Sequence, residues 1–340
     1  MGRRRCTALW AAQSRYRAGT GGRSARRRAC VGGSAGRSPA ARGQCSTTPA
    51  ARSRLAKGAV LVSGTTHVIG IIGDPVSHSL SPRLQNAAFA ALGLDYVYVP
   101  LHVGAADIGA AVRGLAALGF RGANVTIPHK GAVIPYLDEL SDDARLAEAV
   151  NTIVVDGGRL SGHNTDVEGV RSALVAGGAG PLSGGAALVL GAGGAARAAA
   201  LALARLGCSL TVVNRTPAKA ERLAALITAG VPGARCDWLA LPDLTAADVA
   251  RRRVVVNATS LGLAGEGKVP ALLADNVTAG QVVFDAVYGS APTDFLVAAQ
   301  ARGATVIDGL EMLLGQAAEA FNLWTGVPAP LEVMRDAVQR

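Results

Sequence analysis

Acidic residues are missing from the start of the sequence. Residues 1–66 hold 14 of the 34 lysines and arginines but no aspartate or glutamate, and the first acid is Asp74. The rest of the chain carries 20 basic and 24 acidic residues, a net charge of −4, although the whole chain has a formal charge of +10. The positive charge is therefore a property of the N-terminal segment alone.

This N-terminal segment, residues 1–66, is rich in Arg, Gly and Ser and has little hydrophobic periodicity. It cannot bury enough apolar surface to fold, so we expect it to be disordered. Three origins stay open, in order of preference: translated sequence upstream of the true start, an organelle transit peptide, or a nucleic-acid-binding tail. Because no interleaved aromatics or recognition element accompany the charge, we predict no nucleic-acid partner.

Cysteine and long apolar runs are scarce as well. Only Cys208 and Cys236 lie outside the N-terminal segment and no C-x-x-C occurs, so neither a disulfide framework nor a zinc site is indicated. His78, His129 and His163 lack the spacing of metal ligands, and we predict no metal. No apolar run approaches the roughly 18 residues of a membrane span. We therefore expect a cytoplasmic protein without membrane contact.

From residue 67 onward, short β-branched runs alternate with helical segments, which predicts an α/β fold with mostly parallel sheets. The first series has strands at 67–74, 96–103 and 120–127, helices at 83–92 and 105–118, and then a helix and a hairpin around 156–158. The second series has strands at 186–191, 209–214, 252–258 and 281–287, helices at 195–207 and 217–227, and terminal helices at 309–326 and 330–339. In chains of this design the terminal helices often return to the first domain.

A glycine-rich turn, VLGAGGAARA (189–198), follows one predicted strand and opens a helix. Glycines here allow a tight turn and close backbone approach, and a helix N-terminus offers free N–H groups to a pyrophosphate. Ala196 replaces the third glycine of the usual fingerprint and can still pack closely. Alone this motif is a weak signal. The residues predicted to contact a dinucleotide are Gly191, Ala192, Gly193, Gly194 and Ala195.

The end of the next strand favours NADP over NAD. An NAD site would place an acid there for the ribose 2′-hydroxyl, but the strand ends in Asn214, Arg215 and Thr216, with Lys219 one turn later. Arginine can stack on adenine and pair with a 2′-phosphate. Taken alone, Arg215 could instead be a solvated residue at a strand end.

Four further stretches lie at predicted strand ends, where open α/β sheets bind ligands: GDPVSHSLSP (73–82), NVTIPHK (124–130), AVNT (149–152) and HNTD (163–166). With GAGGAARA, NRT, NATS (257–260) and GLEMLLGQ (309–316), in this order and spacing, they closely resemble the shikimate dehydrogenase family. The resemblance covers about residues 67–338. It implies NADPH-dependent reduction of 3-dehydroshikimate to shikimate, a step of chorismate and aromatic amino-acid biosynthesis.

The resemblance also implies a catalytic pair, Lys130 and Asp166. Reduction of a ketone puts negative charge on its oxygen as hydride arrives, so a donor must lie within hydrogen-bond reach. Lysine supplies charge and proton together, whereas arginine would transfer a proton poorly. Pro128 suits the first turn of a helix, which would place Lys130 near a positive dipole end. Taken alone, Lys130 could be a surface lysine and Asp166 a helix cap.

Other site residues follow from the same resemblance. Residues matched to the substrate site, besides the catalytic pair, are Ser79 and Ser81 for the carboxylate, and Thr126, Asn151, Tyr288 and Gln316. Asn124 is expected to brace its loop. Residues matched to the cofactor site, besides the glycine turn and NRT, are Ala286, Gly309 and Asp142. The chain departs from the family pattern at Ser290, where proline is common, and at Ala286, where methionine is frequent.

Three alternative functions are less well supported by these residues. A quinate/shikimate dehydrogenase would prefer NAD, and Arg215 with Lys219 argues against it. A non-catalytic NADP-binding regulator would need neither Lys130 nor Asp166. Nucleic-acid binding would depend on the N-terminal segment. The expected organisation is a catalytic, substrate-binding domain (67–165 with 310–340) and an NADP-binding Rossmann domain (166–309), acting on a small molecule as a monomer or homodimer.

Overall fold

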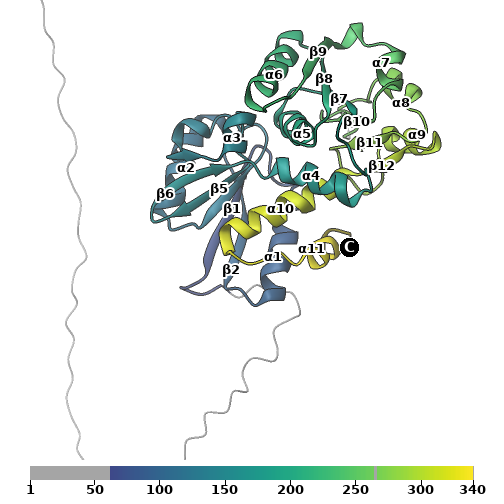
Figure 1. Cartoon of the computed structure of the whole chain (residues 1–340). Helices are drawn as coiled ribbons and strands as arrows, with labels where there is room; N and C mark the ends of the chain where they lie inside the picture. Colours follow the sequence, from purple (N-terminus) through teal and green to yellow (C-terminus); the bar gives the residue numbers. More distant parts are fainter. Residues whose placement is uncertain (1–61, 264–265, 340) are drawn as a thin grey trace, which may run out of the picture. The chain divides into compact units, whose positions relative to one another are not determined.

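The computed structural model describes residues 62–263 and 266–339 (Figure 1). The disorder predicted for residues 1–66 falls, for 1–61, outside the described residues. Residues just before 67 do contact the folded chain, because the hydroxyls of Thr65 and Thr66 donate to the Asp95 carboxylate at 2.8 and 2.6 Å. Thr65 and Thr66, which the prediction includes in the N-terminal segment, therefore already contact the rest of the described chain.

The first sheet has six strands in the order β2-β1-β3-β5-β6-β4. They are β1 (His67–Gly73), β2 (Tyr96–His102), β3 (Gly122–Val125), β4 (Glu139–Leu140), β5 (Thr152–Asp156) and β6 (Arg159–His163). Strands β1, β2 and β3 are parallel, while β5 runs antiparallel to β3 and β6. The predicted hairpin is confirmed: Gly157 and Gly158 both have positive φ, 55° and 84°, as a tight two-residue turn requires.

Helices from both ends of the chain cover this sheet. They are α1 (Ser81–Leu92), α2 (Ile108–Ala117), α3 (Asp142–Ala147), α10 (Gly309–Thr325) and α11 (Leu331–Gln339). The return of the terminal helices is confirmed, because Phe321, Trp324 and Met334 share one buried cluster with Ile69 and Phe89. Full burial of one such side chain contributes about 1.5–3 kcal/mol. Figure 1 shows α10 and α11 beside α1. This sheet and its helices are called the first domain below.

The second sheet is parallel throughout, in the order β12-β11-β10-β7-β8-β9. Its strands are β7 (Ala186–Leu190), β8 (Ser209–Asn214), β9 (Cys236–Ala240), β10 (Val254–Asn257), β11 (Val282–Asp285) and β12 (Thr305–Ile307). Its helices are α4 (Asp166–Ala176), α5 (Gly194–Arg205), α6 (Pro217–Gly230), α7 (Ala246–Ala250), α8 (Ala271–Asn276) and α9 (Asp294–Ala301). These elements form the second domain. Strands β9 and β12 and helices α7 to α9 were not predicted.

Two glycines let α4 and α10 approach closely. A Cβ atom at Gly169 would lie 2.7 Å from the Met312 carbonyl oxygen, and one at Gly315 would lie 2.1 Å from the Ser172 hydroxyl oxygen. Helix α4 contributes Val170 and Leu174 to the core of the second domain. The contact therefore joins the helix that begins at Asp166 to the helix that carries Gln316, and so brings two predicted site residues onto neighbouring helices.

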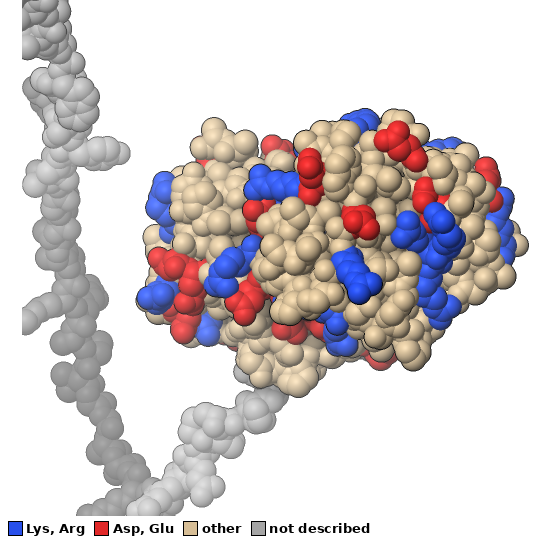
Figure 2. Space-filling model, turned by 45° about the horizontal axis from the view of Figure 1, so that its top comes forward, with Lys and Arg blue, Asp and Glu red and all other residues tan. Residues whose placement is uncertain are grey.

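Surface charge is mixed over the described residues. On the face shown in Figure 2, lysines and arginines are interspersed with aspartates and glutamates. Within residues 62–263 and 266–339, no helix has the length and apolar character needed to cross a membrane.

Candidate active site

Lys130 and Asp166 form an ion pair. Lys130 lies in the turn after β3, Asp166 is the first residue of α4, and their Nζ and Oδ2 atoms are 2.5 Å apart. The side chains are 21% and 6% exposed, so water screens this pair less than a surface pair. A short hydrogen bond between two charged groups is among the stronger polar contacts in proteins. The pairing expected from the sequence is therefore present in the fold.

Asn151 fixes the geometry of this pair. Its Nδ2 donates to Asp166 Oδ1 at 2.8 Å and to Thr165 Oγ1 at 2.9 Å, while its Oδ1 accepts from the Thr165 backbone N–H at 2.7 Å. The backbone N–H of Val150 donates to the Lys130 carbonyl at 2.8 Å. One oxygen of Asp166 is thus held by Asn151, and the other is directed to Lys130.

The helix predicted to begin at Pro128 is absent, so that expectation was wrong. Residues 126–133 include a cis Ile127–Pro128 peptide bond and form turns, and only a short 3₁₀ segment, Ile134–Tyr136, follows them. Lys130 nevertheless lies beside a helix N-terminus, that of α5. A Cβ atom placed on Gly194 would be 3.2 Å from Lys130 Cδ. The Lys130 side chain therefore lies beside Gly194, in the glycine turn predicted to bind the dinucleotide.

The two serines lie at the start of α1. The Ser79 hydroxyl oxygen accepts from the Ser81 backbone N–H at 3.2 Å, and Ser81 is 5% exposed. Thr126 follows β3, and its Cγ2 would lie 2.4 Å from a Cβ atom on Gly73, at the end of β1. Three of the residues matched to the substrate, Ser79, Ser81 and Thr126, therefore follow the carboxyl ends of β1 and β3.

A buried network behind these residues includes Tyr98, which the sequence analysis missed. The Tyr98 hydroxyl donates to Asn124 Oδ1 at 2.6 Å and is hydrogen-bonded by Ser81, and burial raises the pKa of Tyr98. Asn124 Nδ2 donates to the Asn151 carbonyl and to Thr152 Oγ1, both at 3.0 Å. The expected bracing by Asn124 is confirmed. A tyrosine in a strand with an inward-facing polar tip needs such a partner, and that was the available signal.

Tyr288 and Gln316 come from segments distant in sequence. Tyr288 follows β11 and packs against the apolar cluster of the first domain, where burial raises the pKa of its hydroxyl. Gln316 on α10 is 8% exposed, and its Nε2 donates to the Leu313 carbonyl at 2.8 Å. Both side chains therefore lie at the first domain, although Tyr288 follows a strand of the second sheet.

Buried Asp285 fixes the turn that carries Ala286 and Tyr288. Its carboxylate accepts from Asn257 Nδ2 at 2.8 Å, from the Val287 backbone N–H at 3.1 Å and from the Thr293 hydroxyl at 2.6 Å. Burial is the main cause that raises the pKa of Asp285. The sequence shows Asp285 at the end of an apolar run, but it does not show which residues donate hydrogen bonds to it.

The glycine turn has the backbone that its sequence predicts. Gly191 directly follows β7 with φ 116°, and a Cβ atom there would lie 2.9 Å from the Ala258 carbonyl oxygen. Gly193 precedes α5, and no side chain among the described residues caps that helix, which leaves its first N–H groups available to an anion. Ala196 is fully buried, which confirms that alanine packs closely in place of the third glycine.

Two cations without carboxylate partners lie at the end of β8. Arg215 and Lys219 are exposed, and neither forms an ion pair among the described residues. Asn214 Nδ2 donates to the Thr216 carbonyl at 3.0 Å and shapes the turn between them. This arrangement suits a phosphate group better than a bare ribose hydroxyl.

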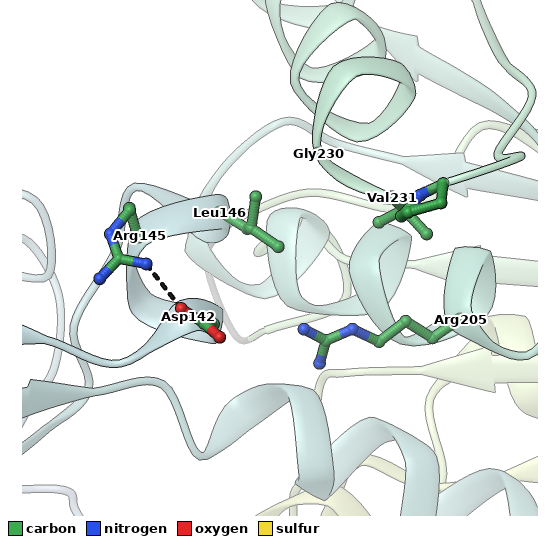
Figure 3. A pocket seen from close by; sticks show the side chains of 7 residues that line it. Asp142, Arg145, Leu146, Arg205, Gly230 and Val231 are labelled. Atoms are coloured by element: carbon green, nitrogen blue, oxygen red, sulfur yellow. Dashed lines mark hydrogen bonds and ion pairs between the residues drawn. The ribbon is translucent and has the colours of Figure 1, made fainter.

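The remaining cofactor candidates lie in different places. Gly309 abuts Ala286, since a Cβ atom on it would lie 2.5 Å from the Ala286 carbonyl oxygen. Asp142 lies at the start of α3, 84% exposed, and pairs with Arg145 at 2.6 Å. It lines a surface hollow of about 420 Å³ beside Leu146, Arg205 and residues 230–232 (Figure 3). Asp142 therefore faces the C-terminal end of α5, whereas the glycine turn is at the N-terminal end.

Family models match most of this chain. Residues 71–153 match the shikimate dehydrogenase substrate binding domain, residues 174–281 match shikimate / quinate 5-dehydrogenase, and residues 309–339 match the shikimate 5′-dehydrogenase C-terminal domain.

Individual proteins agree with these matches. A shikimate dehydrogenase (NADP(+)) of Moorella thermoacetica is 48% identical over 277 residues, covering 81% of this chain and 93% of the relative. The structure of shikimate 5-dehydrogenase from Listeria monocytogenes in complex with shikimate and NAD is 35% identical, with a TM-score of 0.77, covering 83% of this chain and 100% of that one. That of shikimate 5-dehydrogenase from Thermus thermophilus in complex with NADP(H) and shikimate is 38% identical, with a TM-score of 0.71, covering 81% and 98%.

Proposed function

Because the chain belongs to the shikimate dehydrogenase family of oxidoreductases, we propose that it reduces 3-dehydroshikimate to shikimate with NADPH. The observation that carries this proposal is the buried ion pair of Lys130 and Asp166 against the N-terminus of α5. In this proposal Lys130 is the proton donor, and the support is that its side chain pairs with Asp166 and lies beside Gly194 at the start of α5.

The glycine turn and the end of β8 fit NADPH. The space beside Gly191 is too small for a side chain, so the turn requires glycine there. The N-terminus of α5 suits the pyrophosphate. Arg215 and Lys219 suit the 2′-phosphate. When bound, the dinucleotide supplies the hydride. The Moorella relative is named as an NADP(+) enzyme and the Thermus structure contains NADP(H), in line with this assignment, whereas the Listeria structure contains NAD.

Lys130 carries the proton chemistry. As hydride forms the new C–H bond, the carbonyl π electrons move to oxygen, and the Lys130 ammonium stabilises that charge and gives it a proton. Solvent then returns a proton to Lys130, so the chain itself is unchanged after each turnover. Asp166 holds the ammonium in place, and Asn151 keeps Asp166 from rotating away.

The remaining polar residues would bind the substrate. Ser79 and Ser81 would donate hydroxyl hydrogen bonds to its carboxylate. Its hydroxyls or carboxylate would be contacted by Thr126 just after β3, Asn151 just before β5, Tyr288 after β11 and Gln316 on α10. Tyr98 and Asn124 keep two of these partners, Ser81 and Asn151, in place from behind.

An initial-rate assay tests the proposal. Shikimate and quinate are each oxidised with NADP⁺ and with NAD⁺, and kcat/KM is compared across the four pairs. We expect shikimate with NADP⁺ to give the highest value. A preference for quinate with NAD⁺ would instead support the quinate/shikimate alternative, and no turnover with any pair would favour a non-catalytic binder.

A further inference from the structure

Glu148 has an unusual backbone conformation. Its φ and ψ are 46° and 39°, and within the described residues it is the one non-glycine residue with positive φ. Side chains disfavour this left-handed region because Cβ approaches a carbonyl oxygen. Such a conformation persists where surrounding contacts determine it, and it is found preferentially at functional sites. The contacts of Glu148 are therefore informative.

Its carboxylate connects the two domains. Glu148 ends α3 of the first domain, and its Oε2 accepts from Arg197 Nη1 on α5 at 2.8 Å. Arg222 Nη2 on α6 donates to both carboxylate oxygens, at 2.9 and 2.8 Å. Arg197 Nη1 also donates to the Ala147 carbonyl at 3.0 Å. Arg197 and then Arg222 are the largest causes that lower the pKa of Glu148.

The residues after Glu148 lead directly to the catalytic pair. The Ala149 carbonyl accepts from Asn164 Nδ2 at 2.9 Å. The next residue, Val150, holds the Lys130 backbone, and Asn151 holds Asp166. On the other side, Arg197 is the fourth residue of α5, which begins at Gly194. One carboxylate thus connects the helix predicted to hold the pyrophosphate with the segment that positions Lys130 and Asp166.

Neighbouring contacts keep α3 against α5 and α6. Asp143 pairs with Arg205 at the far end of α5, and Leu146 packs so closely on Gly230 that a Cβ atom there would lie 2.5 Å from Leu146 Cδ2. Figure 3 shows the side chains of Leu146 on α3 and Arg205 on α5 extending into the space between these two helices from opposite sides. These contacts alone leave the backbone of Glu148 unexplained, since none involves its side chain.

We propose that Glu148 is a positioning residue, whose contacts with Arg197 and Arg222 fix the glycine turn relative to Lys130 and Asp166. The inference rests on the proposed function, in which hydride passes from a cofactor on one domain to a substrate on the other. Displacement of reacting groups by about 1 Å can slow a reaction about 10²-fold. The contact of Glu148 with the two arginines is called the Glu148 clasp below.

Two variants distinguish a positioning role of the Glu148 clasp from a role in stability alone. Glu148→Gly removes the carboxylate but suits the left-handed backbone, so Tm should change little. Its kcat should fall about tenfold, an intermediate misplacement effect, while the Kd for NADP⁺, measured by binding alone, stays within about twofold. Glu148→Gln keeps the backbone constraint and the shape without the charge, and should lower kcat less. Asp275→Asn, which removes an ion pair with Arg302 elsewhere in the second domain, is the matched control and should leave kcat unchanged.

A second readout does not depend on turnover. Amide hydrogen exchange in residues 147–151 should be faster in Glu148→Gly than in Asp275→Asn or the parent protein. Normal kcat in Glu148→Gly, or unchanged exchange in 147–151, would overturn the clasp. A fall in kcat that merely follows Tm across the variants would make the residue structural only. If the parent protein does not oxidise shikimate, the proposed function fails, and the exchange measurement still decides the clasp.

Discussion

The two domains contribute different kinds of chemical groups to the proposed site. The first domain uses side chains: Lys130 and Asn151 meet Asp166, the first residue of α4 in the second domain, in a buried hydrogen-bond network that extends through Asn124 to Tyr98. The second domain uses mainly backbone, a glycine turn and the open N-terminus of α5, and adds the two exposed cations at the end of β8. Catalysis should therefore be sensitive to single side chains of the first domain, and cofactor choice to the edge of the second.

Removing the lysine should have the largest effect. Lys130→Ala should lower kcat by about 10²-fold or more, the usual contribution of a positioned acid–base group. Lys130→Arg should keep the charge and still be slow, because guanidinium seldom gives up its proton. KM for shikimate should change much less, since Ser79 and Ser81 remain. Steady-state kinetics measure this, with Lys268→Ala, an exposed lysine paired to Asp294, as the control. Near-normal kcat with a raised KM would make Lys130 a binding residue.

Removing one hydrogen bond from the buried network of Tyr98 and Asn124 should lower the free energy of unfolding. We expect no such loss from side-chain changes in the glycine turn of the second domain. Tyr98→Phe leaves Asn124 Oδ1 without its donor inside the protein. An orphaned buried acceptor costs about 1–3 kcal/mol in the free energy of unfolding, measurable by urea denaturation. Tyr96→Phe on the same strand removes a hydroxyl from a half-buried ring and serves as the control. Equal stability of the two variants would contradict the role given to Tyr98.

A substitution in the second domain should change the preference for NADP⁺ over NAD⁺ and leave the chemistry of the first domain in place. Arg215→Asp should raise KM for NADP⁺ relative to NAD⁺ by about tenfold or more, equivalent to at least about 1.4 kcal/mol. Reversing the charge removes a phosphate partner and introduces a group that can accept from a ribose hydroxyl. The maximum rate with NAD⁺ should change little. If both dinucleotides lose affinity equally, Arg215 supports the fold and does not select the phosphate.

The smallest effect is expected outside both domains. Deleting residues 1–61 should leave kcat, KM and Tm nearly unchanged, because that segment lacks acids and hydrophobic periodicity. The deletion stops before Thr65 and Thr66, whose hydroxyls contact Asp95. Kinetics and thermal unfolding of the truncated and full chains test this. A large loss in either would show that the segment takes part in folding or catalysis.

Much of this architecture was predictable where the sequence pattern is local. The strands β7, β8, β10 and β11 are mostly buried and rich in apolar, β-branched residues, and the glycine turn and the hairpin are set by their own residues. Edge strand β9 was missed because it is half exposed, and β12 because it is only three residues long.

The details of the site depended on tertiary contacts. Pro128 looked like the start of a helix, but the chain turns there, and the helix N-terminus beside Lys130 comes from α5, which begins only at Gly194. The left-handed backbone of Glu148 could not be predicted either, because glutamate does not favour it and the two arginines that bind it lie on other helices. The pairing of Lys130 with Asp166 could thus be predicted from family motifs, while the contacts that support the pair could not.

The central claim is that Lys130 and Asp166 act as one catalytic unit, and a double-mutant cycle on kcat tests it most directly. The rates of Lys130→Ala, Asp166→Asn and the double variant are measured with shikimate and NADP⁺ at saturation. If Asp166 acts through Lys130, the double variant should be about as slow as Lys130→Ala alone, because groups that work as a unit are strongly non-additive. If the two single effects simply multiply in the double variant, the residues act independently and the account of the pair is contradicted.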